Sequence, residues 1–130
     1  MNLKIIFKRF VLIDLAIVIL LIISIFFQSE IVTTFNETIN PENNMSDMLA
    51  ILAIIYLIAW LVSLYLLYKF KPIGKQIYLF VFIFGSILSL LMGINAFGPI
   101  EYLIEGLSWA TSGAILALLY FSPIKKEFDK

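Results

Sequence analysis

The sequence contains neither cysteine nor histidine. This excludes disulfide bonds, thiol chemistry, imidazole acid–base catalysis and the Cys- and His-based sites that usually hold zinc, haem or iron–sulfur clusters. The sequence also has no nucleotide-binding loop, no cluster of metal ligands and no pairing of a nucleophile with a base. We therefore expect a protein that is not an enzyme and that has no cofactor, no bound metal and no nucleic-acid partner.

Charged residues are scarce as well. They make up 14% of the 130 residues, whereas 62% are hydrophobic and the mean hydropathy is +1.05. A soluble domain has about 25% charged and roughly 45–50% apolar residues. The composition predicts an integral membrane protein whose residues 1–130 form one transmembrane domain in contact with the lipid bilayer.

Four apolar runs approach or reach the roughly 20 residues that a helix needs to cross a bilayer. The predicted spans cover residues 10–27, 48–68, 76–94 and 102–121. Pro72 and Gly74 predict a tight turn between the second and third spans, and Pro99 suits the first turn of the last helix. The expected fold class is therefore an all-α, up-and-down bundle of four transmembrane helices.

The distribution of charge predicts the orientation. The nine basic residues all flank the same side of the predicted spans: Lys4, Lys8, Arg9, Lys69, Lys71, Lys75, Lys125, Lys126 and Lys130. The other side carries only acids: Glu30, Glu37, Glu42, Asp47, Glu101 and Glu105. By the positive-inside rule both termini are cytoplasmic. The Ile-, Lys- and Asn-rich composition is typical of a bacterial protein, so we expect the cytoplasmic (inner) membrane.

The outer loop over residues 28–47 is the one long connection. Ile31, Phe35 and Ile39 recur every four residues, which is the spacing of one face of a helix. A short amphipathic helix at the outer membrane surface explains this spacing. An ordinary polar loop is an equally good interpretation of the sequence.

Small residues predict how the helices pack, because close approach in lipid favours Gly, Ala and Ser. Gly85, Ser89 and Gly93 form one stripe on the third span. The small residues of the fourth span are Gly106, Ala110, Gly113, Ala114 and Ala117. We expect the two stripes to pack against each other as an antiparallel pair. The alternative is that one stripe forms a subunit interface.

Asp14 is the one charged residue well inside a predicted span. It follows Arg9 by five residues, or roughly 7–8 Å of helix, which predicts a position in the inner quarter of the bilayer. Its expected partners near that level are Tyr65, Tyr78, Tyr120, Ser122, Lys69 and Lys125. Asp14 then either exchanges a proton or cation, or forms a structural hydrogen bond or ion pair. The shallow position favours the structural role.

Glu101 and Glu105 are one helical turn apart at the outer end of the last span. They form either an acidic mouth that gathers cations or, as we prefer, acids placed near a helix N-terminus by its dipole. Mid-span Trp60 is expected to pack in the bundle or against lipid.

These features predict a small non-enzymatic membrane protein that acts by association with another membrane protein or with itself. It would be an accessory subunit or an immunity-type protein that intercepts a membrane-directed partner. The alternative is a small oligomeric transporter or channel component in which Asp14 is the proton- or cation-coupling acid.

Overall fold

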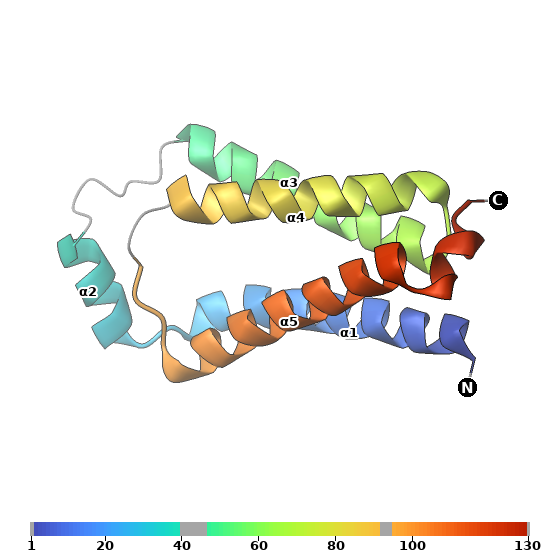
Figure 1. The fold of residues 1–130 in the computed structure, drawn as a ribbon. Coiled ribbons are helices and arrows are strands. Elements are labelled where there is room, and N and C mark those ends of the chain that lie inside the picture. The colour runs from blue at the N-terminus through green and yellow to red at the C-terminus, as the bar shows by residue number, and fades with distance from the viewer. Residues whose placement is uncertain (1, 40–46, 92–94, 130) are drawn as a thin grey trace.

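The computed structural model describes residues 2–39, 47–91 and 95–129, whose regular structure is entirely helical (Figure 1). The elements in chain order are α1 (Leu3–Ser24), η1 (Ile25–Phe27), α2 (Glu30–Ile39), α3 (Asp47–Tyr68), α4 (Pro72–Leu91), α5 (Pro99–Phe121) and η2 (Pro123–Glu127). The predicted all-helical class is confirmed. The part of the chain between the described ranges includes Gly93 of the predicted stripe, so that residue lies outside the described structure.

Three helical segments are long and apolar enough to cross a membrane: Ala50–Tyr68, Pro72–Leu91 and Pro99–Phe121. They correspond to the second, third and fourth predicted spans. α1 has 22 residues, but its apolar stretch is interrupted by Lys8, Arg9 and Asp14. The number of four spans therefore stays a prediction, and the three apolar helices are what the structure supports.

The ends of the helices differ from the prediction at two places. α1 begins at Leu3 rather than near residue 10, which makes Asp14 the twelfth of its 22 residues. α4 begins at Pro72, so Gly74 lies within the helix and not in the turn. Pro99 occupies the first turn of α5, as the sequence predicts.

Phe70 makes the turn between α3 and α4, with a left-handed backbone (φ 54°) that is uncommon for a residue other than glycine. Its N–H donates to the Leu67 carbonyl (3.0 Å), and the Lys71 N–H donates to the Leu66 carbonyl (2.9 Å). These two bonds are the pair that closes a Schellman motif at a helix C-terminus. The strain is offset because the Phe70 ring packs on Phe7 and Phe128.

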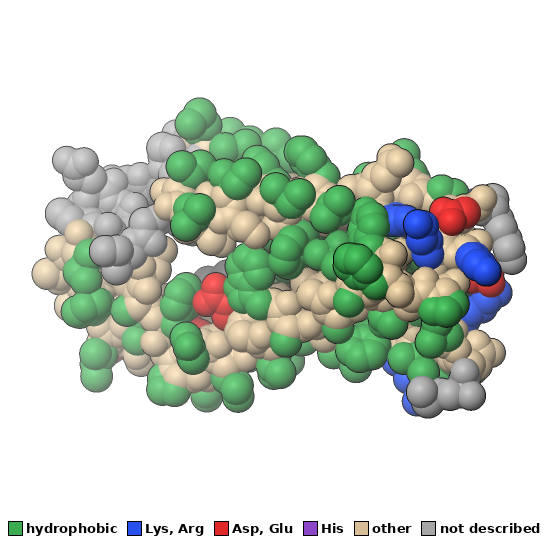
Figure 2. Space-filling view, in the orientation of Figure 1, with side chains coloured by type: hydrophobic (Ala, Val, Ile, Leu, Met, Phe, Trp, Pro, Cys, Tyr) green, Lys and Arg blue, Asp and Glu red, His purple; other side chains and the backbone are tan. Residues whose placement is uncertain are grey.

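The helices pack as two pairs, α3 with α4 and α1 with α5. Figure 1 shows that the pairs meet at the end that holds both termini and diverge toward α2. α4 and α5, the third and fourth predicted spans, make few contacts with each other. The expected antiparallel pairing of these two spans is therefore wrong. The charge order of the sequence makes the converging end the basic end and the diverging end the acidic end (Figure 2).

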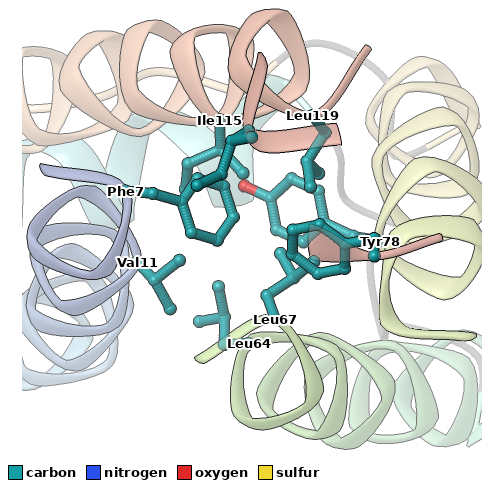
Figure 3. Packing of buried hydrophobic residues seen from close by; sticks show 9 residues of the cluster. Phe7, Val11, Leu64, Leu67, Tyr78, Ile115 and Leu119 are labelled. Carbon is teal, nitrogen blue, oxygen red and sulfur yellow. The ribbon is translucent and has the colours of Figure 1, made fainter. Parts of the chain in front are cut away.

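The buried core lies at the basic end, and Figure 3 shows how its side chains pack together. Its members are Phe7, Val11, Leu64, Leu67, Tyr78, Ile115, Leu119, Ile124 and Phe128. The ring centroid of Phe7 is 5.7 Å from that of Phe70 and 5.6 Å from that of Phe128. An ion pair between Lys4 Nζ and Glu127 Oε2 (2.8 Å) lies outside these rings. The C-terminal turn η2 therefore helps to close this end.

At the acidic end the structure has the short helix, α2, rather than the polar loop that the sequence left equally open, and Ile31, Phe35 and Ile39 are exposed on it. Asn36 joins it to the segment before α5. The Asn36 amide donates to the Ala96 carbonyl (3.1 Å), and the Ala96 N–H donates back to the Asn36 Oδ1 (2.7 Å). These two bonds hold α2 across this end, and its apolar side chains are left exposed.

Candidate functional site

Asp14 is fully buried between the two helix pairs. The Tyr78 hydroxyl donates to its Oδ2 (3.0 Å), and the Trp60 Nε1–H donates to the same oxygen (3.2 Å). The Ser112 hydroxyl donates to Oδ1 (3.4 Å). One carboxyl group on α1 is thus bonded to one side chain from each of α3, α4 and α5.

This arrangement has a structural consequence. A buried carboxyl group without partners is costly, and three donors satisfy both of its oxygens. Because the donors come from three helices, the same bonds hold α1 in a fixed register against the rest of the bundle. Hydrogen bonds between membrane helices average about 0.6 kcal/mol each, so the cluster stabilises the register modestly.

Of the expected partners, the structure brings Tyr78 to Asp14 and places the other two tyrosines elsewhere. Tyr65 is 62% exposed, and the ring of Tyr120 lies 4.5 Å from the Lys75 ammonium group. Trp60 and Ser112 were not among the expected partners. A mid-span tryptophan needs an acceptor for its N–H, and this requirement is the sequence signal that points to Trp60.

Directly beside this cluster, toward the acidic end, is a cavity of about 190 Å³. Trp60, Tyr78 and Ser112 line it, so the three donors to Asp14 also form part of its wall. Tyr56 and Trp109 add further aromatic surface. The cavity therefore ends on the Asp14 cluster.

A second cavity, of about 380 Å³, lies next to the first. The two share four lining residues: Leu21, Tyr56, Trp60 and Glu105. The second also reaches Gln28, Phe97 and Glu101 near the acidic end. We call the two together the cleft. Figure 2 shows the space between the helix pairs open on this face, with an acidic side chain beside it.

Small residues of α4 make room for the cleft. A Cβ built on Gly85 would collide with the ring and hydroxyl of Tyr56, so glycine at this position lets that ring lie across α4. Ser89, one turn further, also lines the first cavity. Gly85 and Ser89, the described part of the stripe predicted on the third span, therefore face α3 and the cleft.

The stripe predicted on the fourth span faces outward. A Cβ on Gly106 or Gly113 would meet nothing within 4 Å. Ala110 and Ala117 are exposed, and Ala114 is half-buried. A different face of α5 packs on α1 and borders the cleft. Its buried residues are Ser108, Ser112, Ile115 and Leu119. The subunit-interface alternative for this stripe stays a prediction.

The two outer acids have different surroundings. Glu101 Oε2 accepts a hydrogen bond from the Gly98 N–H (2.8 Å). This bond caps the N-terminus of α5, as a glutamate three residues after the N-cap commonly does. Glu105 lies beyond the first turn and lines both cavities. The helix-terminus explanation thus suits Glu101, whereas Glu105 is a wall residue of the cleft.

No family model matches this chain, and neither a curated protein nor a solved structure is similar to it. Within residues 2–39, 47–91 and 95–129, no group of three acidic side chains is placed to hold a metal ion. The cleft and the Asp14 cluster are consequently the features of the molecule that bear on its function.

Proposed function

We propose that this chain is a non-enzymatic integral membrane protein of four spans, with α1 as the first span. Its length of 22 residues supports this, since about 20 helical residues cross the hydrocarbon core. The proposal places both termini in the cytoplasm, because all nine basic residues flank one side of the spans. The Ile-, Lys- and Asn-rich composition is the reason for proposing a bacterial inner membrane.

We further propose that the protein acts by binding a small, mainly apolar molecule in the cleft. The observation that carries this proposal is a pair of adjoining cavities walled by Tyr56 and Trp60 and bordered by Glu105. Ligand sites are typically concave and apolar with a few polar groups.

The two tryptophans give a direct test. Trp60 and Trp109 are the only tryptophans in the sequence, and both line the first cavity. Bromobenzene, an apolar heavy-atom quencher, should quench their emission saturably in lipid nanodiscs. A Ser89→Phe variant, which places a ring in the cavity, should remove the saturable part while keeping the helical circular dichroism. Linear quenching that is the same in both proteins would overturn the proposal.

Association with a second protein, as an accessory or immunity-type subunit, stays a prediction with its own test. Such a partner should copurify from native membranes in mild detergent. Crosslinking that yields only the monomer would count against it.

Transport is a second candidate, and one observation favours it. The three donors that hold Asp14 also line the cleft, so an arriving ligand touches the groups that fix this acid. If Asp14 couples transport to a proton or cation, Asp14→Asn should abolish coupled flux in proteoliposomes. Unchanged flux would remove the coupling role.

A further inference from the structure

We propose that the ligand of the cleft is an organic cation with an apolar body, such as an aryl or alkyl quaternary ammonium compound. This inference rests on the proposed binding function and adds the chemical class of the ligand. Its basis is the combination of aromatic walls with the carboxylate of Glu105, for which the described part of the chain provides no hydrogen-bond or ion-pair partner.

Aromatic side chains from three helices, α3, α4 and α5, line the first cavity. Tyr56 and Trp60 form one edge-to-face pair, with ring centroids 5.4 Å apart at 70°. Phe82 and Trp109 form another, 5.5 Å apart at 79°. Aromatic faces carry negative electrostatic potential, and tryptophan is the ring that attracts cations most strongly. Such walls recognise ammonium groups whose water shell is weak.

The charge of the cleft has the matching sign. Glu105 lines both cavities, and among the residues that the structure describes it has no hydrogen-bond or ion-pair partner. Every basic residue of the sequence flanks the opposite end. A carboxylate beside an apolar cavity attracts a cation and repels an anion, and a low-dielectric wall strengthens both effects.

An inorganic cation fits these walls less well. Calcium takes six to eight oxygen ligands, and magnesium keeps several waters in a strict octahedron. In the first cavity Glu105 is the one lining carboxylate among the described residues, and its other side-chain oxygens are neutral hydroxyls of serine and tyrosine among rings and aliphatic groups. An organic cation needs no such set of ligands, because its body is matched by apolar surface.

The test compares a cation with its neutral isostere. Phenyltrimethylammonium and tert-butylbenzene share their shape and differ by one charge. Binding to the full chain in nanodiscs of zwitterionic lipid is followed by tryptophan emission and calorimetry. We expect the cation to bind at least about tenfold more tightly. Glu105→Gln should remove this preference. Glu37→Gln, which changes the same charge on exposed α2, should keep it.

The outcomes separate the two proposals. Equal affinity for both probes, or a preference that survives in Glu105→Gln, overturns the cation assignment and leaves the binding function standing. A cation preference that both variants lose equally also overturns it, because the general field of the acidic end would then explain the result. Saturable binding of neither phenyltrimethylammonium nor bromobenzene removes the binding function as well.

Discussion

The two ends of this bundle are built from the same four long helices but are closed to different degrees. At the basic end the rings of Phe7, Phe70 and Phe128 pack together, and nine side chains form a continuous buried core. At the acidic end the helix pairs diverge around the cleft (Figure 1). The Asp14 cluster lies between the packed core of the basic end and the cleft of the acidic end.

Side-chain size accounts for this difference. Bulky side chains from α1, α3, α4 and α5 fill the basic end together with Ile124 and Phe128, so the four long helices have a common core there. Toward the acidic end, Gly85, Ser89 and Ser108 line the space between the pairs, and small side chains leave it partly empty. In lipid such a space is not closed by the hydrophobic effect, because acyl chains are as apolar as the helix surface.

The largest effect should come from truncating the core of the basic end. Phe7→Ala removes a ring that is fully buried, and such truncations cost about 3 kcal/mol or more. The matched change at the acidic end is Phe26→Ala, whose ring is 81% exposed and should cost less than about 0.5 kcal/mol. Unfolding in mild detergent measures both. Similar losses of unfolding free energy in the two variants would contradict the conclusion that the basic end is packed and the acidic end is open.

A smaller effect is expected where the two regions meet. Asp14→Leu leaves the donors on Trp60, Tyr78 and Ser112 without their acceptor. We expect a loss of about 2 kcal/mol in the free energy of unfolding. Asp14→Asn keeps one oxygen acceptor and should lose about half as much. A Leu variant as stable as the parent chain would show that the cluster does not fix the register.

The glycines give the finest comparison. A Cβ on Gly74, at the basic end, would lie 2.8 Å from the Leu66 Cβ and 3.0 Å from its carbonyl carbon. Gly74→Ala should therefore destabilise the α3–α4 hairpin by about 1–2 kcal/mol. Gly106→Ala, at the acidic end, meets nothing and should be neutral or stabilising by about 0.5 kcal/mol. Thermal unfolding tests both, and a loss in Gly106→Ala would indicate a subunit contact on that face.

Much of the architecture follows from the sequence. Apolar runs and their breaks predict the long helices. The spacing of Ile31, Phe35 and Ile39 left a short helix and a polar loop equally open, and the structure has the helix, α2. The pairing of helices does not follow, because small residues occur on both faces of the relevant spans. The stripe on α5 faces outward, whereas Ser108 and Ser112, on another face, line the cleft.

The Asp14 site was predictable in part. The acid and Tyr78 follow from the sequence, because both lie at comparable distances from the basic residues. Trp60 does not follow in this way, because it is nine residues from Lys69 whereas Asp14 is five residues from Arg9, and yet the fold brings the two side chains together. The charge of Glu105 was visible, but its place in the cleft depends on how the helix pairs diverge.

Cysteine labelling tests most directly whether one end is open and the other sealed, because the natural sequence has no cysteine. Ser89→Cys places a thiol in the wall of the cleft, and Ser63→Cys places one at a fully buried position on α3. A membrane-impermeant methanethiosulfonate reagent is added to vesicles of either orientation. We predict that Ser89→Cys reacts from the outer side and that phenyltrimethylammonium slows this reaction, while Ser63→Cys reacts from neither side. Equal labelling of the two thiols, or labelling of Ser89→Cys only from the cytoplasmic side, would contradict the account.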